Sequence, residues 1–282
     1  MRKVLVLAVV VAFTLCSRST TASAATVFLD TFELATYSSP PVEEDINDEL
    51  LGGRQPFGAS SYTEAGAAFI QDDNVPPPID DALVLRTSAN ANASASSADL
   101  DADFGADLAG KKYRVSYDGQ VDHAPGIAAD NWQAFAIGDT SADGPNGASA
   151  DFGILLRLDG GWQAFLDGAA VANGGGSGIV PGLPYSIDFD FDETIASPTV
   201  TATVNATLGA VVLGTLPIDA LNPGTAFESG GRFFELKVFQ GANGALLDTR
   251  LDNFQIEVIP EPASLALLTL ASISCLAIRR KR

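Results

Sequence analysis

Metal binding is the chemistry that best suits three aspartates at alternate positions, namely Asp99, Asp101 and Asp103. Carboxylate oxygens are the ligands that Ca²⁺ prefers in proteins. The stretch does not complete a calcium-binding loop, because Phe104 stands where such a loop needs glycine and Gly110 where it needs a bidentate glutamate. Calcium at these aspartates is therefore the one cofactor that we consider. The sequence contains no complete cofactor-binding motif.

A second acidic series occurs between residues 185 and 192, where apolar and acidic side chains alternate strictly. This alternation is typical of a strand with one buried face, and its polar face would consist of Asp188, Asp190 and Asp192. These carboxylates could line a cation, but like charges along a strand are more often only its solvated face. We expect the solvated face here.

Sugar binding is the chemistry that the two tryptophans, Trp132 and Trp162, could supply. An aromatic ring offers a flat apolar platform to a sugar, and a few polar side chains then fix its orientation. Trp162 follows the Asp159-Gly160 turn, which would place its ring near the rim of a β-sandwich. The alternative for either ring is a position in the hydrophobic core.

Catalysis has little support in the sequence. The single histidine, His123, follows Asp122, but no serine elbow accompanies them, so a hydrolytic triad is not expected. Glycosidases need two carboxylates flanking one sugar bond. The Glu-x-Asp-x-x-Glu strand of laminarinase-type glycoside hydrolases has no copy, and the nearest acidic run, residues 43–48, follows two prolines. We therefore expect no enzymatic activity, with a glycoside hydrolase as the alternative.

Short strands separated by turn signals fill most of the chain between residues 26 and 258. Alternating or β-branched runs predict strands at residues 26–33, 83–86, 112–117, 132–138, 151–158, 161–166, 169–171, 185–192, 200–207, 232–240 and 251–258. The acidic stretch at residues 43–49 is expected to be a loop, and no long amphipathic helix precedes residue 263. These elements predict an all-β fold, arranged as an antiparallel β-sandwich.

Two Asp-Gly pairs mark turns in this series of strands. Asp159-Gly160 joins two predicted strands as a two-residue hairpin signal, and Asp167-Gly168 closes the next turn. Residues 152–168 resemble the hairpin of concanavalin A-like (laminin G-like) jelly rolls, and residues 251–254 are similar to their last strand. The resemblance implies one jelly-roll domain over residues 26–258, in which the closing strand pairs with the opening strand around residues 28–32.

Residues 1–25 have the three zones of a secretory signal peptide. Arg2 and Lys3 supply positive charge, and residues 4–15 form an apolar run. That run is too short to cross a bilayer, which takes about 20 helical residues. We expect signal peptidase to act at a cleavage site formed by small residues, Ala22, Ala24 and Ala25.

Residues 259–282 contain three features in a fixed order. The triplet Pro260, Glu261 and Pro262 comes first, an uncharged stretch at residues 263–278 follows, and a basic end at residues 279–282 closes the chain. The uncharged stretch predicts a single hydrophobic transmembrane helix, and the basic end predicts that this side stays in the cytoplasm. In this order, the three features closely resemble the PEP-CTERM sorting signal of Gram-negative bacteria that make extracellular polysaccharide.

The PEP-CTERM resemblance implies an exosortase as a processing partner. This membrane cysteine protease would cut near Glu261 and pass the protein from the inner membrane to the cell surface or extracellular matrix. A permanent C-terminal membrane anchor is the alternative. Residues 26–259 are exported under both interpretations. With exosortase processing, the protein stays in the inner membrane only transiently.

Charge and cysteine content fit an exported domain. Without its two end segments the chain has nine lysines and arginines against 34 aspartates and glutamates. Such acidity excludes nucleic acid as a partner, because phosphate binding needs the opposite charge. The only cysteines, Cys16 and Cys275, lie in the end segments, so the domain has no disulfide.

The sequence therefore predicts an exported surface or matrix protein whose β-sandwich domain binds polysaccharide or another surface component. Two alternatives stay open. One is a secreted glycan-active hydrolase of the same fold, and the other is a purely structural matrix protein.

Overall fold

The computed structural model describes residues 24–32, 43–45, 62–72, 81–87, 94–123, 131–140, 144–207, 209–219, 226–241 and 247–260. Most of the expected signal peptide, including Ala22, lies outside these residues. So do Glu261, Pro262 and the expected helix at residues 263–278. None of the helices in the described ranges has the length and apolar character that crossing a membrane takes.

Strands form nearly all of the described domain, because its polar and apolar residues alternate with a period of two. One group of strands consists of β1 (Ala25–Asp30), β2 (Glu43–Asp45), β4 (Ala67–Asp72), β5 (Asp81–Arg86), β7 (Lys112–His123), β12 (Tyr185–Asp192), β13 (Thr199–Ala206), β14 (Gly209–Pro217) and β16 (Leu247–Val258). The other group consists of β3 (Tyr62–Ala65), β6 (Ser94–Leu100), β8 (Asn131–Gly138), β9 (Phe152–Arg157), β10 (Trp162–Leu166), β11 (Ala169–Gly174) and β15 (Phe233–Gln240). A single helical turn, α2 (Gly105–Leu108), follows β6.

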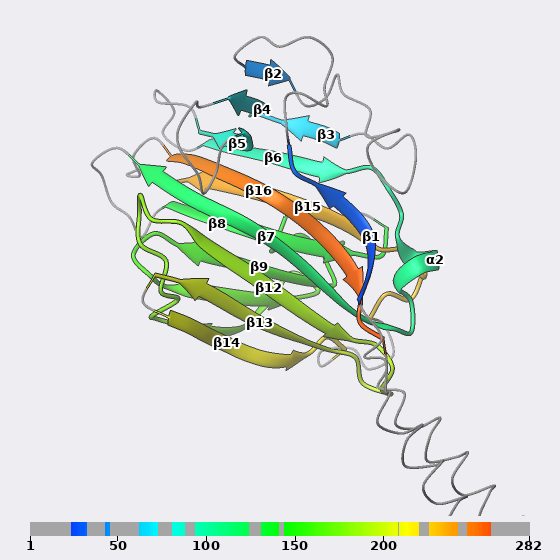
Figure 1. Ribbon diagram of the computed structural model, residues 1–282. Coiled ribbons are helices and arrows are strands. Elements are labelled where there is room, and N and C mark those ends of the chain that lie inside the picture. The colour runs from blue at the N-terminus through cyan, green and yellow to red at the C-terminus, as the bar shows by residue number, and fades with distance from the viewer. Residues whose placement is uncertain are drawn as a thin grey trace, which may run out of the picture. The chain divides into compact units, whose positions relative to one another are not determined.

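The strands form two sheets that face each other as a sandwich (Figure 1). The nine-stranded sheet has the order β14-β13-β12-β7-β16-β5-β4-β2, with β1 also paired to β16. The seven-stranded sheet has the order β11-β10-β9-β8-β15-β6-β3. The predicted all-β sandwich is therefore confirmed, and so is the pairing of the closing strand with the opening strand.

Several strands differ from the sequence expectation. Residues 43–45 form β2 and pair with β4, although a loop was expected there. Four further strands, β3, β4, β6 and β14, were not predicted. The sequence of β6, Ser-Ala-Ser-Ser-Ala-Asp-Leu, has only one large apolar residue, and β14 contains two glycines. Both belong to the sheets because neighbouring strands supply their backbone partners.

The two Asp-Gly pairs form different turns. Asp167 and Gly168 both have positive φ angles, 46° and 73°, and they alone connect β10 to β11. This is the geometry of a two-residue hairpin turn whose twist matches that of its strands. The connection from β9 to β10 is longer than expected and spans residues 158–161, with only Gly160 at positive φ.

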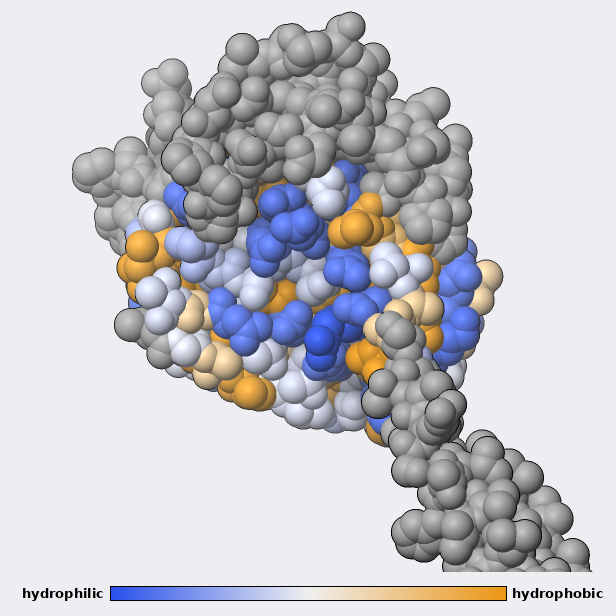
Figure 2. Space-filling view, in the orientation of Figure 1, coloured by the Kyte–Doolittle hydropathy of each residue, from blue (hydrophilic) through white to orange (hydrophobic). Residues whose placement is uncertain are grey.

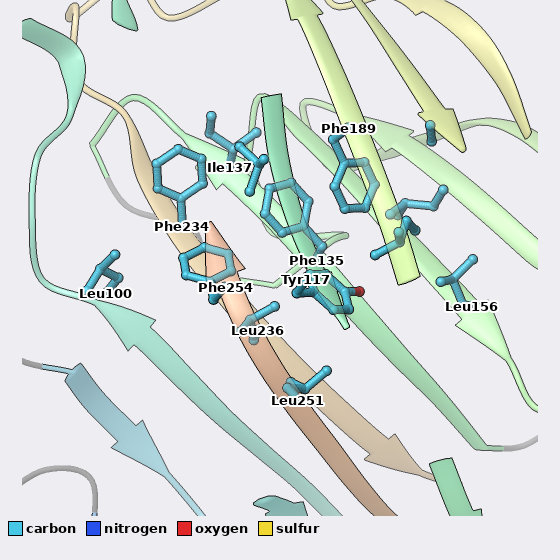
Figure 3. Close-up of a cluster of buried hydrophobic side chains, with 14 of the residues drawn as sticks. Leu100, Tyr117, Phe135, Ile137, Leu156, Phe189, Phe234, Leu236, Leu251 and Phe254 are labelled. Carbon is cyan, nitrogen blue, oxygen red and sulfur yellow. The ribbon is translucent and has the colours of Figure 1, made fainter. Parts of the chain in front are cut away.

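Aromatic rings from both sheets meet in the core (Figure 3). Phe135 of β8 stacks on Phe189 of β12 with ring centroids 4.3 Å apart, so the contact joins the seven-stranded sheet to the nine-stranded one. Phe152 of β9 contacts the edge of the same Phe189 ring. Close packing of this kind is sensitive to the loss of any one ring.

A buried ion pair also links the two sheets. Glu193, which follows β12, accepts hydrogen bonds from Arg232, which precedes β15, and from the Tyr113 hydroxyl at 2.7 Å. The guanidinium of Arg232 also lies 3.8 Å from the centroid of the Phe227 ring. Burial and the neighbouring Glu193 charge raise the pKa of Tyr113 well above its usual range, which keeps its hydroxyl a donor. The charges are thus compensated on all sides, as burial requires.

Replacing Phe189 by alanine should destabilise the domain strongly. The side chain has 0% exposure and contacts rings from both sheets, so its removal leaves a cavity costing about 3–5 kcal/mol. Urea unfolding followed by tryptophan fluorescence measures this change. The control is Val212→Ala on β14, where the side chain is 63% exposed and the expected change is within about 0.5 kcal/mol. Equal effects of the two substitutions would contradict this core.

Candidate functional site

The outer face of the seven-stranded sheet carries a small apolar cluster. Along β8, Phe135 points into the core between the sheets, whereas Trp132 and Ala134 lie on the opposite side. Ala134, Leu155 of β9 and Phe165 of β10 form the cluster, and Trp132 packs against it. Apolar side chains thus gather on a face that the core does not use.

Trp132 and Phe239 form a stacked pair at one end of this cluster. The two residues are direct partners across β8 and β15. Their ring centroids lie 4.9 Å apart and their planes differ by 16°. Both side chains are half-buried, so they present part of their surface to solvent. We call Trp132 and Phe239 together the aromatic ledge.

Two polar side chains lie on the same face as the aromatic ledge. Arg157, the last residue of β9, is the direct partner of Trp132 on the side away from Phe239. Gln163 of β10 is the partner of Leu155 in the next row of the same face. Both are half-buried. This part of the face therefore combines partly exposed aromatic rings with hydrogen-bond donors, which is the combination that a sugar site needs.

The other end of the face is covered by the segment that precedes β9. Pro145 lies directly on Gly153, where a Cβ atom would come within 2.3 Å of the proline Cα. The Gly144 N–H donates a hydrogen bond to Glu235, whose other carboxylate oxygen lies 3.1 Å from the ammonium of Lys237. This segment therefore covers the end of the face at Gly153 and Glu235, and it does not cover the end that carries the aromatic ledge.

Trp162 lies on the inner side of β10. Its ring packs against the main core and, with Phe152 and Leu213 among others, lines a small apolar pocket between the sheets. The indole also lies against Gly174, where a Cβ atom would come within 2.7 Å of Nε1. The two tryptophans are thus on opposite sides of the seven-stranded sheet, and Trp132 is the one on the outer face.

An acidic cleft of about 860 Å³ lies at the far end of β8. Its carboxylates come from three separate connections, with Asp139 and Asp151 flanking the segment between β8 and β9, Asp167 in the β10–β11 turn and Glu228 before β15. Sequence reasoning missed this cleft. Its acids are spread over about ninety positions and share no spacing, so only the fold reveals them.

Asp151 is the most perturbed of these acids. Its side chain is 7% exposed, and Oδ1 accepts a hydrogen bond of 3.0 Å from the Phe227 N–H. The buried Oδ2 has no hydrogen-bond partner among the described residues. Burial, helped by the nearby charges of Asp139 and Asp167, raises the pKa of Asp151 to about 6. The carboxyl can therefore hold a proton in mildly acidic solution.

The candidate calcium aspartates take part in separate contacts. Asp99 lies near the end of β6, and Asp101 accepts a hydrogen bond of 2.8 Å from the Thr63 hydroxyl. Asp103 accepts hydrogen bonds from the backbone N–H groups of Gly105 and Arg232. In the described part of the chain, no three acidic, histidine or cysteine side chains are grouped as a metal ion requires. Calcium binding here stays a prediction.

The acidic face of β12 is neutralised by its neighbours. Asp190 pairs with Arg114 at 2.8 Å and Asp192 with Lys112 at 2.7 Å, both across to β7. Asp188 accepts a hydrogen bond of 3.0 Å from the side chain of Asn205. Figure 2 shows hydrophilic side chains gathered on this face of the nine-stranded sheet. The arrangement is that of a solvated strand face.

The residues expected at the processing sites lie next to the first and the last described strands of the chain. Ala24 is exposed, and Ala25 begins β1. Pro260 lies two residues after the end of β16. The PEP-CTERM protein-sorting motif matches residues 258–282, so the matched segment begins at the last residue of that strand. The chain thus carries a PEP-CTERM sorting signal.

The sandwich is similar to solved lectins. The seed lectin of Lotus tetragonolobus superposes with a TM-score of 0.51 at 11% identity, covering 71% of this chain and 94% of the lectin. Lectin I of Ulex europaeus, solved with the methyl glycoside of alpha-L-fucose, gives 0.53 at 9% identity, covering 77% and 95%. No curated protein sequence matches the chain. The domain therefore has the concanavalin A-like jelly-roll fold of legume lectins.

Asp151→Asn should alter the pH dependence of stability. The pKa of Asp151 is higher in the folded state, at about 6, than its ordinary value of 3.8, so folding favours the protonated form. Wild-type stability should therefore fall as the pH rises from 4 to 6, relative to the variant. Above pH 6 the variant should be more stable by about 1 kcal/mol, since asparagine can still accept the Phe227 N–H.

Urea unfolding at several pH values measures this difference. The control is Asp159→Asn, because Asp159 is exposed and only accepts a hydrogen bond from the Gly161 N–H, which asparagine can also accept. A constant difference between Asp151→Asn and wild type across pH 4–7 would disprove the assignment.

Proposed function

We propose that this chain is an exported surface or matrix protein whose jelly-roll domain binds polysaccharide at the aromatic ledge. The observation that carries the proposal is the stacked, half-buried pair of Trp132 and Phe239 on the outer face of the seven-stranded sheet. The ledge gives a sugar ring an apolar surface at low entropic cost, because the two rings already support each other.

The surroundings of the ledge support a site for sugars. Arg157 and Gln163 stand on the same face and can donate hydrogen bonds to hydroxyl groups. The Ulex europaeus lectin, which has the same fold, was solved with a fucoside. That lectin is only 9% identical to this chain, so the proposal depends on the ledge itself and not on shared residues.

The sorting signal supports a location outside the cell. A PEP-CTERM motif implies processing by an exosortase on the way to the surface of a Gram-negative cell. We place the cut near Glu261, after signal peptidase has removed residues 1–25. The acidic domain would then reside among extracellular polysaccharides, where a ligand for the ledge is abundant.

A hydrolase of the same fold is less well supported. Asp151 has the raised pKa that a general acid needs, and other carboxylates lie near it in the cleft. Its free oxygen, however, is buried, whereas a general acid must reach the glycosidic oxygen. Binding without catalysis therefore fits the described geometry better.

Trp132→Ala should reduce binding to the extracellular polysaccharide of the producing bacterium by about 5- to 150-fold. The loss follows from removing one stacking surface, at about 1–3 kcal/mol by analogy with other ring stacking on aromatic side chains. Affinity electrophoresis in gels that contain the polysaccharide measures the change. Trp162→Phe is the matched control, because this ring faces the inner side of the same sheet and should leave binding intact. Undiminished binding by Trp132→Ala would refute the ledge.

Glu261→Ala should hold the protein in the inner membrane. The substitution removes the only charge in the Pro-Glu-Pro triplet, so the exosortase would lose its recognition element. Cell fractionation followed by immunoblotting measures the distribution between inner membrane and surface. Glu257→Ala is the matched control, because this glutamate lies in β16 just before the matched motif and should leave sorting unchanged. Identical distributions of Glu261→Ala and wild type would refute exosortase sorting.

A further inference from the structure

Arg157 differs from the other described cations of the domain in having a free guanidinium. Of the seven other lysines and arginines in the described ranges, five form ion pairs: Arg86 with Asp248, Lys112 with Asp192, Arg114 with Asp190, Arg232 with Glu193 and Lys237 with Glu235. Lys111 donates to the backbone carbonyl of Asp107, and Arg250 also has an interaction partner. Among the lysines and arginines of the described ranges, only Arg157 makes no side-chain hydrogen bond, ion pair or ring contact.

A free arginine is unexpected in so acidic a domain. The exported part has 34 acidic residues for nine basic ones, so each cation has several potential partners. The nearest acid in the sequence, Asp159, instead accepts a hydrogen bond of 2.8 Å from the Gly161 N–H. The stem of Arg157 lies against the same turn, with Cδ 3.5 Å from the position that a Cβ atom on Gly161 would take. The stem of the side chain thus lies close to this turn, and its guanidinium stays available.

The position of Arg157 relative to the ledge follows from the strand register. Phe239, Trp132 and Arg157 are direct neighbours on three adjacent strands, β15, β8 and β9. Adjacent strands lie about 4.8 Å apart, so the row spans about 10 Å. Phe239 already covers one face of the Trp132 ring, and Arg157 lies on the other side of Trp132. A sugar ring against the free face of Trp132 would therefore have its substituents within reach of the guanidinium.

We propose that the aromatic ledge selects carboxylated polysaccharides, with Arg157 binding the carboxylate of a uronic acid stacked on Trp132. This inference rests on the proposed function and assigns a ligand class to the same site. A guanidinium presents paired N–H donors that match the two oxygens of a carboxylate. The rest of the domain repels an anion, but this repulsion is screened beyond about 8 Å at physiological salt, so the contact with Arg157 governs the choice.

The test compares polymers that differ only in their carboxylates. The probes are polygalacturonate and alginate, each beside its carboxyl-reduced, neutral form, at about 0.15 M salt. The proteins are the exported wild type, Arg157→Gln, Arg157→Lys and Trp132→Ala, with urea midpoints as a check of folding. We expect the wild type to bind at least one polyuronate about tenfold more tightly than its neutral form, the worth of one charge-assisted hydrogen bond. Arg157→Gln should remove this preference, and Arg157→Lys should retain part of it.

The outcomes separate this inference from the proposed function. If the wild type binds the acidic and neutral polymers equally, and Trp132→Ala weakens both, the ledge binds sugars and the role of Arg157 is refuted. An equal loss on both polymers in Arg157→Gln also refutes it, because a structural role would act in that way. If the wild type binds none of these polymers, the ligand class is refuted, and the sugar ledge fails as well when the polysaccharide of the producing bacterium is not bound either.

Discussion

Each strand of this domain must turn one face toward the space between the two sheets, and this constraint decides where chemistry can occur. Phe135 and Phe189 meet in that space, and the alternation of side chains then sends Trp132 to the opposite side of its strand. The two outer faces have different contents. That of the nine-stranded sheet carries ion pairs such as Arg114 with Asp190, whereas that of the seven-stranded sheet carries stacked rings.

The aromatic ledge and the acidic cleft lie at opposite ends of β8. Trp132 is near its first residue and Asp139 follows its last, so about 23 Å of strand separate them. At this distance the charges of the cleft are screened from the ledge, and the two regions can be altered independently. The ledge offers surface for stacking, whereas the cleft offers a carboxyl, Asp151, whose proton affinity the fold has raised.

Strong alternation in the sequence was enough to predict part of the fold. The strand at residues 185–192 has the predicted bounds, because apolar and polar residues alternate along its whole length. By contrast, β6 consists mostly of serine and alanine and β14 is interrupted by glycine, so their alternation is weak although both pair with neighbouring strands. The spacing of Trp132 and Phe135 is enough to predict that the two rings lie on opposite faces of their strand. The pairing of Trp132 with Phe239 could not be predicted in this way. The two residues are more than one hundred positions apart, and only the order of strands in the sheet brings them together.

The continuity between β16 and the sorting signal affects what remains after processing. β16 pairs with β7 up to Val258, which is also the first residue of the matched motif, so no spacer separates them. A cut within the Pro-Glu-Pro triplet would therefore leave only a few residues beyond a paired strand. Such a terminus would offer exopeptidases very few unpaired residues to bind, which would slow degradation of the domain outside the cell.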